Sequence, residues 1–316
     1  MSPVTPIDGR RFCVISPCRD ETEYMRFTLD SVTAQTIPPT LWVIVDDGST
    51  DGTAEILREY ADQFNYIRIV HRTGSTARRV GPGVVEAFYE GYREIDPEDF
   101  DYICKLDLDL ELPPKYFQTL IERMEADLRL GSCSGKPYNH IDGRLEPEPC
   151  DDSMSVGMTK FYRTPCFEQI GGFEKEVMWD GIDCHRSRML GWKVRAWSDS
   201  PDLRFVHLRP MGSSQKGILT GRMRHGFGQW FMGTSLPYIL VSAAFRSTKP
   251  PILLGGLSIL WGYLRSAIAG KPRYGDPEFR KFLRRYHWDC LSQGKSKAAE
   301  TTEERMAPNF RGTANR

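Results

Sequence analysis

The sequence lacks the features of a secreted or a zinc-binding protein. Its cysteines never form a Cys-x-x-Cys pair, so the spacing typical of a structural zinc site is missing. The opening MSPVTPIDGRR has no apolar segment of the kind found in signal peptides. We therefore expect a cytoplasmic protein with reduced thiols. The eight cysteines are scattered, several of them inside apolar runs as small core residues are: Cys13, Cys18, Cys104, Cys133, Cys150, Cys166, Cys184 and Cys290.

A net charge is also lacking, because 42 Lys and Arg balance 42 Asp and Glu. The balance hides a split along the chain. Residues 204–290 hold 14 basic and 3 acidic residues, a net charge of +11, whereas residues 1–203 hold 23 basic and 36 acidic residues, a net charge of −13. An acidic first part and a basic second part suggest two different partners, although the two parts can also simply neutralise each other.

The basic part, residues 204–290, lacks a uniformly apolar stretch of about 20 residues. A membrane-spanning helix needs a stretch of that length. Residues 226–245 and 250–264 carry no charge, but both contain Gly, Pro or polar residues. They predict interfacial, membrane-associating helices within residues 221–290, and an ordinary pair of core helices is the alternative. The polar residues 291–316 are expected to form a disordered tail. Basic residues flank the two stretches, and each contributes roughly 1 kcal/mol of attraction near an anionic leaflet: Arg246, Lys249, Arg265, Lys271 and Arg273.

Short apolar runs alternate with helical patterns in the first part of the chain. Residues 12–16, 41–45 and 66–70 each indicate a buried strand. Between these runs, apolar residues recur at the spacing of helix faces. This order predicts βαβ units and an α/β fold with a mainly parallel sheet flanked by helices, as in Rossmann-like proteins.

Polar motifs follow three of the expected strands: SPCRDE (16–21), DDGSTDGT (46–53) and DLDLEL (107–112). In such sheets ligands bind beyond the carboxyl ends of the strands, and all three motifs fall at that edge. The sequence therefore predicts a binding site there.

The stretch KLDLDLEL, residues 105–112, alternates leucine with charged residues. A strand of this sequence would carry leucine on one face and three carboxylates on the other. Asp107 and Asp109 would repel each other, and one bound Mg²⁺ or Mn²⁺ would remove that repulsion. An edge strand with an acidic outer face is the alternative.

Together with GGFEKEVMWDGID (171–183), these motifs resemble, in this order, the family-2 inverting glycosyltransferases of the GT-A fold. The resemblance covers roughly residues 10–210, within an expected catalytic domain of residues 10–220. It implies a nucleotide-sugar donor, Mn²⁺ or Mg²⁺ as cofactor, and inversion at the anomeric carbon. By this resemblance Asp46 and Asp47 are the base- and ribose-binding carboxylates.

The same resemblance assigns Asp107 and Asp109 to the metal, with Asp107 also on the donor side. Pro17, Arg19 and Glu21 belong to the first polar motif and are expected to contact the donor loosely. The contact is loose because Asp20 stands where the family usually shows Asn.

The catalytic base has two candidates. The family usually shows Glu-Asp before an Arg-rich helix that ends in Gly. Counting back from Gly191 places Trp179 at the Glu position and Asp180 at the Asp position, and Asp183 competes three residues later. We favour Asp180, since a base must accept the proton of the attacking hydroxyl. Trp179 can instead stack on the face of a donor sugar.

Two further residues follow the catalytic motifs. The resemblance suggests His207 as a third metal ligand, because imidazole binds Mn²⁺, and a structural histidine is the alternative. Arg224, with the nearby Lys216 and Arg222, can close over the diphosphate leaving group, or it can belong to a solvated basic face.

These observations predict a metal-dependent glycosyltransferase. It would transfer a sugar from a nucleotide-sugar to a lipid-linked glycan acceptor, as in polysaccharide or surface-glycan assembly, while attached peripherally to the inner face of the cell membrane. Nucleic acid is not expected among its partners. The alternative, suggested by the altered Glu-Asp position, is a catalytically silent sugar-nucleotide-binding component of a membrane complex.

Overall fold

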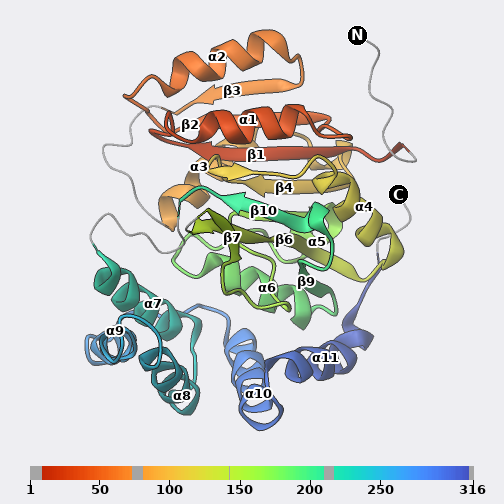
Figure 1. The fold of residues 1–316 in the computed structure, drawn as a ribbon. Coiled ribbons are helices and arrows are strands. Elements are labelled where there is room, and N and C mark those ends of the chain that lie inside the picture. The colour runs from red at the N-terminus through yellow and green to blue at the C-terminus, as the bar shows by residue number, and fades with distance from the viewer. Residues whose placement is uncertain (1–8, 73–80, 142, 210–216, 313–316) are drawn as a thin grey trace.

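The computed structural model describes residues 9–72, 81–141, 143–209 and 217–312. In this part of the chain ten strands form one sheet with the order β3-β2-β1-β4-β8-β6-β10-β5, and β7 and β9 both pair with β6 (Figure 1). The strands are β1 Phe12–Cys18, β2 Leu41–Asp46, β3 Ile67–His71, β4 Tyr102–Leu106, β5 Leu110–Glu111, β6 Leu130–Ile141, β7 Arg144–Pro147, β8 Thr159–Arg163, β9 Lys193–Trp197 and β10 Arg204–His207. The helices are α1 Met25–Thr33, α2 Thr53–Gln63, α3 Pro82–Tyr92, α4 Tyr116–Ala126, α5 Thr164–Gln169, α6 Trp179–Met189, α7 Ile218–Met232, α8 Leu236–Ser247, α9 Leu254–Ile268, α10 Pro277–Gln293 and α11 Lys295–Met306.

The first half of the sheet confirms the expected βαβ pattern. Strand β1 pairs in parallel with β2 and β4, and β2 pairs in parallel with β3. Of the nine strand pairings recorded for the described residues, five are parallel and four antiparallel. The sheet is therefore mixed, and three of its five parallel pairs join β3, β2, β1 and β4, the end that carries the first two polar motifs.

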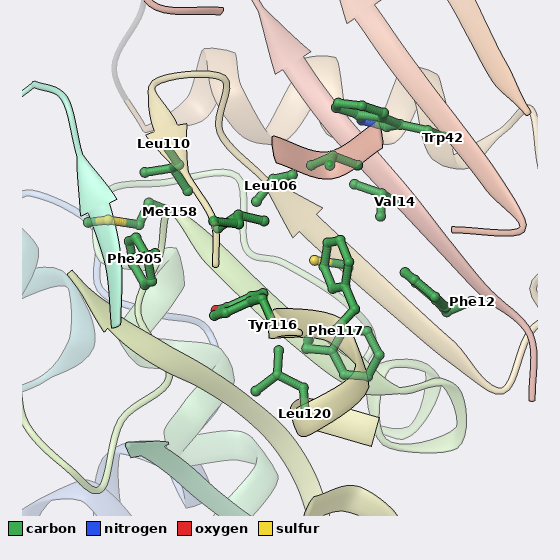
Figure 2. Close-up of a cluster of buried hydrophobic side chains, with 14 of the residues drawn as sticks. Phe12, Val14, Trp42, Leu106, Leu110, Tyr116, Phe117, Leu120, Met158 and Phe205 are labelled. Atoms are coloured by element: carbon green, nitrogen blue, oxygen red, sulfur yellow. The ribbon is translucent and has the colours of Figure 1, made fainter. Parts of the chain in front are cut away.

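Both faces of the first strands are buried, as continuous apolar runs require. Phe12 and Val14 of β1 point into the core under α1 and α2, whereas Cys13 and Ile15 point into the core under α3. Figure 2 shows the first of these cores, in which Phe12 packs beside Phe117 of α4 at 5.0 Å between ring centroids. Two buried faces fix the register of the strand, and so they fix where its polar end emerges.

The stretch KLDLDLEL is not one strand, contrary to expectation. Strand β4 ends at Leu106 and β5 begins at Leu110, so Asp107 and Asp109 lie in the connection between them. The expected burial does hold, because all four leucines of the stretch are at most 4% exposed. The break lets β5 pair antiparallel with β10, which places Leu110 opposite His207.

The basic region forms helices α7, α8 and α9, which project from the sheet (Figure 1). Helices α7 and α9 pack so closely that a Cβ atom on Gly226 would lie 2.0 Å from the carbonyl oxygen of Ile259. Within the described residues, none of the helices has the length and apolar character needed to cross a membrane.

The expected disordered tail is wrong for residues 291–312, because helix α11 and the residues after it pack on the catalytic domain. Glu303 of α11 is 3% exposed and forms a two-oxygen ion pair with Arg195 of β9, at 2.5 and 2.7 Å. The ring of Phe310 meets that of Trp192 at 4.8 Å, edge to face. Local polarity predicted disorder here, and these distant contacts order the segment instead.

Candidate active site

The loops after β1 and β2 are joined by hydrogen bonds at the carboxyl edge of the sheet. The amide of Asp20 donates to Ser49 Oγ at 3.0 Å, and the amide of Thr50 donates to Asp20 Oδ1 at 2.8 Å. Pro17 lies opposite Val45 in the β1–β2 register, so the two motifs leave the sheet at the same level. The structure thus brings together the two polar motifs that the sequence places 30 residues apart.

Asp46 and Asp47 lie at this edge and are only 5% and 7% exposed. Asp46 Oδ1 accepts from the amide of Ser49 at 3.0 Å, and its Oδ2 lies 3.3 Å from His71 Nδ1. Asp47 accepts from Arg72 at 3.0 Å and lies 3.8 Å from Arg19. Both carboxylates are therefore held as oriented acceptors, a suitable arrangement for the hydroxyl and N–H groups of a nucleoside.

Glu21 is engaged by an arginine that the sequence analysis missed. Arg209 Nη2 donates to Glu21 Oε2 at 2.6 Å, and Arg209 Nη1 lies 3.7 Å from Asp109 Oδ2. Its guanidinium also lies 5.1 Å from the ring centre of Tyr24. The one available signal was its position two residues after His207. Arg209 links the first polar motif to the expected metal ligands and brings a positive charge between them.

Asp109 and His207 lie side by side, as the expected metal site requires. His207 Nε2 lies 3.9 Å from Asp109 Oδ2, while its Nδ1 lies 3.0 Å from Glu148 Oε2. The second oxygen of Asp109 is buried and has no hydrogen-bond partner among the described residues. Burial, followed by the nearby Asp107 charge, raises the pKa of the Asp109 carboxyl to about 6. An unpartnered carboxylate oxygen beside an imidazole nitrogen fits a divalent cation.

Asp107 points to a different partner. Lys105, which is 2% exposed, places its ammonium 2.5 Å from Asp107 Oδ1 and 2.9 Å from the carbonyl oxygen of Gly157. Consequently, across the described ranges, no three His, Cys, Asp or Glu side chains converge into a metal site. The Asp109–His207 pair fits a cation as it stands, whereas one oxygen of Asp107 is paired with Lys105.

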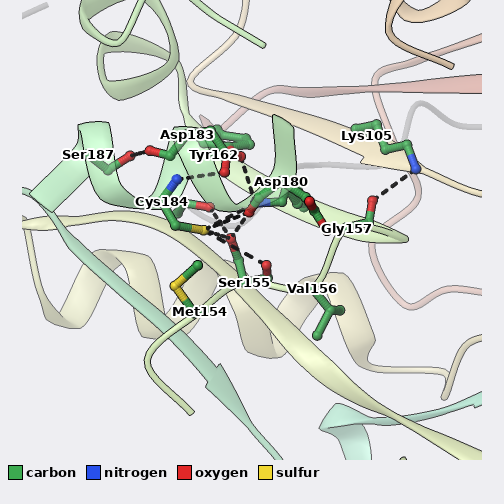
Figure 3. Close-up of polar contacts among 12 residues, drawn as sticks. Lys105, Met154, Ser155, Val156, Gly157, Tyr162, Asp180, Asp183, Cys184 and Ser187 are labelled. Atoms are coloured by element: carbon green, nitrogen blue, oxygen red, sulfur yellow. Dashed lines mark hydrogen bonds and ion pairs between the residues drawn. The ribbon is translucent and has the colours of Figure 1, made fainter. Parts of the chain in front are cut away.

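Asp180 lies in the first turn of α6, where the helix dipole favours a carboxylate. Its side chain packs against Gly157, so closely that a Cβ atom there would lie 2.9 Å from Asp180 Oδ2. The carbonyl of Gly157 in turn accepts from Lys105, the partner of Asp107 (Figure 3). One short network thus joins the preferred base to the expected metal-binding carboxylate.

Asp183, the competing base, lies in the protein interior (Figure 3). Its side chain and that of Lys160 are both 0% exposed, with Lys160 Nζ 2.6 Å from Asp183 Oδ2. The hydroxyl of Tyr162 donates to the same oxygen. Burial raises the pKa of the Asp183 carboxyl, while Lys160 opposes that shift. These contacts hold Asp183 as the partner of a buried ammonium.

Trp179 is packed in the interior, and Arg224 lies on α7. Trp179 is 8% exposed and packs on Phe173 at 4.7 Å, with the Lys105 and Lys160 ammoniums 5.4 and 5.8 Å from its ring centre. Little of the indole is left for contact with a sugar. Arg224 lies half-buried on α7, and Lys216 lies outside the described residues.

Sequence comparison connects these motifs to known proteins. Residues 13–173, about half of the chain, match Glycosyl transferase family 2. Glycosyltransferase AglE of Haloferax volcanii is 35% identical over 238 residues, covering 68% of this chain and 72% of AglE. Glycosyltransferase YibD of Escherichia coli is 27% identical over 150 residues, and this match covers 47% of this chain and 41% of YibD. The chain thus aligns with less than half the length of YibD.

Structure comparison agrees with the motifs. The mannosyltransferase PcManGT of Pyrobaculum calidifontis, solved with GDP-Man and Mn²⁺, matches 95% of this chain and 85% of its own chain, with a TM-score of 0.52 and 18% identity. This likeness shows a shared GT-A fold. The family match, the AglE relative and the fold together lead to one conclusion: the chain belongs to glycosyl transferase family 2.

Proposed function

We propose that the protein transfers a sugar from a nucleotide-sugar donor to a glycan acceptor with inversion at the anomeric carbon. The observation that carries the proposal is the network in which Asp107, Lys105 and Gly157 join the expected donor site to Asp180. These contacts support a site in which an acidic donor side and a candidate base lie at one edge of the sheet. A glycosyl transfer needs both within the length of one sugar.

On the donor side, Asp46 and Asp47 would bind the base and ribose, and Arg19 lies beside Asp47 to approach the phosphates. The structure of PcManGT contains GDP-Man and Mn²⁺, which supports a nucleotide-sugar and a divalent cation for this chain as well. Asp109 and His207 would hold Mn²⁺ or Mg²⁺, joined by Asp107. When bound, such a cation stabilises the charge of the leaving diphosphate.

On the acceptor side, Asp180 would accept the proton of the acceptor hydroxyl while that oxygen attacks the anomeric carbon. The bond from this carbon to the diphosphate oxygen breaks as the new glycosidic bond forms. Asp183 cannot take this role in the arrangement described, since its carboxylate is paired with Lys160 in the interior. Arg224 stays a candidate for binding the diphosphate.

We also propose that the acceptor is lipid-linked and that the enzyme works at the inner face of the cell membrane. The basic helices α7–α9 support this location. Their charge suits an anionic leaflet, and α7 packs against Met178, which directly precedes Trp179 and Asp180.

The test is a panel of nucleotide-sugars incubated with Mn²⁺ and scored for donor hydrolysis and for transfer, with EDTA as the metal-free control. Turnover of one donor that stops in EDTA and in the variant Asp180→Asn supports the proposal. Tight donor binding without any turnover would instead support the catalytically silent binding component.

A further inference from the structure

Helices α8 and α9 carry their large apolar side chains on the outside. Of the 18 exposed large hydrophobic residues in the described part of the chain, 11 fall between residues 236 and 268. On α9 they recur at intervals of three and four residues and so form one continuous stripe. We call these residues the apolar face: Leu236, Leu240, Val241, Phe245, Ile252, Leu253, Leu254, Leu257, Trp261, Leu264 and Ile268.

The inner side of the same helices combines a small cluster of Ile239, Ile259 and Tyr263 with glycines at the closest helix contacts. Gly226 of α7 approaches Ile259 of α9, and Gly262 of α9 approaches Met223, so that an added Cβ atom would lie 2.0 to 2.1 Å from a backbone oxygen. Gly256 makes an equally close approach to Ala243 of α8. A continuous row of large apolar residues on the outside, over close glycine contacts on the inside, departs from the usual pattern of a water-exposed helix. This arrangement matches that of helices that lie against lipid.

The charge around the apolar face has one sign. Residues 236–275, which include the apolar face, contain five Lys and Arg and no Asp or Glu. Lys249 lies exposed in the connection between α8 and α9, and Arg265 lies exposed between Leu264 and Ile268 of the apolar stripe. A protein partner with an apolar surface would not require this uniform basic border, whereas an anionic bilayer does.

The helices of the apolar face are linked by packing, through α7, to the segment that carries the candidate base Asp180. Helix α7, against which α9 packs, contacts the residue before α6, because a Cβ atom on Gly228 would lie 2.3 Å from Met178. Met178 directly precedes Trp179 and Asp180. A surface that binds the α8–α9 pair would therefore lie close to the candidate base.

We propose that the apolar face of α8 and α9 docks on the surface of an anionic bilayer, with the helices lying in the interface. Helix α9 has 15 residues, or roughly 22 Å at 1.5 Å per residue, which is too short for a hydrocarbon core of about 30 Å. This inference rests on the proposed function, since it identifies where a lipid-linked acceptor would reach Asp180.

The test is sedimentation of the full-length protein with vesicles of phosphatidylglycerol and phosphatidylcholine, compared with phosphatidylcholine alone. Trp261→Asp and Ile268→Asp remove large apolar groups from the face, so each should weaken binding to the anionic vesicles by roughly tenfold or more. Leu128→Asp is the matched control, because Leu128 is similarly exposed, at 59% against 54% for Trp261, but lies on the catalytic domain. It should bind vesicles as the wild type does.

Donor hydrolysis without vesicles separates this inference from the proposed function, because neither substitution touches the catalytic groups. Vesicle binding lost with hydrolysis retained supports the docking face even if the acceptor is not lipid-linked. Equal binding of wild type and both variants, or no binding at low salt, would overturn it. A concentration-dependent dimer that dissociates in Trp261→Asp would also overturn it, by identifying a second copy as the occupant.

Discussion

The substitution Asp183→Asn separates a structural carboxylate from a catalytic one. Asp183 and Lys160 are 2.6 Å apart and both side chains are 0% exposed. Asparagine keeps the shape but removes the charge, so the buried ammonium of Lys160 loses its counter-ion. Tyr162, which donates to the same carboxylate, also loses a charged acceptor.

The size of the effect follows from burial. Removing one member of a buried ion pair costs about 3–5 kcal/mol, because the remaining charge stays uncompensated. Each kcal/mol lowers the melting temperature of a domain of 150–250 residues by about 2–4 °C. We therefore expect Asp183→Asn to melt roughly 6–20 °C below the wild type. Asp180→Asn, on the half-exposed first turn of α6, should change the melting temperature little and reduce transfer ~10²–10⁴-fold.

The assay pairs thermal unfolding with donor binding and transfer rate for each variant. Asp199→Asn is the matched control, since it makes the same change in an exposed ion pair with Arg123 and should cost no more than about 1 kcal/mol. If Asp183→Asn is too unstable to purify, Lys160→Met combined with Asp183→Leu removes both charges. This double variant should recover most of the stability.

One result would refute the reasoning. If Asp183→Asn melts with the wild type, binds donor normally and loses transfer, then Asp183 is the base, and the ion pair with Lys160 opens during catalysis. The assignment of Asp180 would then be one helical turn away from the correct residue.

Three further predictions follow from the same structure. Burial raises the pKa of Asp109 to about 6, against 3.8 when unfolded, so the ionised carboxylate destabilises the fold fully above pH 6 and not below about pH 4. In EDTA, Asp109→Asn should therefore raise the free energy of unfolding by roughly 2–3 kcal/mol at pH 7.5 and leave it unchanged at pH 4. The same variant should lose Mn²⁺ binding. Glu148→Gln removes the carboxylate that orients His207, and calorimetry should show roughly tenfold weaker Mn²⁺ binding with the fold intact, whereas unchanged affinity would argue against His207 as a ligand. Glu303→Gln leaves the buried Arg188 and its neighbour Arg195 without their carboxylate. Chemical denaturation should show a free energy of unfolding lower by about 3–5 kcal/mol. A denaturation midpoint equal to that of the wild type would show that these ion pairs do not hold α11.

The strands and their polar ends could be predicted from the sequence because their signals are local. Residues 12–15 and 41–45 are apolar at every position facing either side of the sheet, and such runs specify a doubly buried strand. The turn that follows β2 uses Gly48 and Gly52, both with positive φ, so the motif also predicts where the chain leaves the sheet. Asp46 and Asp47 were therefore placed correctly at the edge.

The choice between Asp180 and Asp183 depends on contacts that are not local. Both acids lie on α6, three residues apart, with the same neighbours in sequence. What distinguishes them is Lys160 and Tyr162 of β8, more than 20 residues away. The same reason explains the ordered end of the chain, since the polar helix α11 is fixed by Glu303 reaching Arg195, 108 residues before it. The number of polar residues in a segment does not predict which of them will pair with a buried residue that is distant in sequence.

Most carboxylates of the polar motifs pair with Arg or Lys side chains of the same chain. These pairs explain how an acidic edge folds without a ligand. Asp47 is held by Arg72, Glu21 by Arg209 and Asp107 by Lys105. Asp109 differs, because one of its buried oxygens has no hydrogen-bond partner among the described residues. A donor diphosphate with its cation would therefore enter a site that is already largely neutral, exchange these internal pairs for its own, and provide a partner for the unpaired oxygen of Asp109.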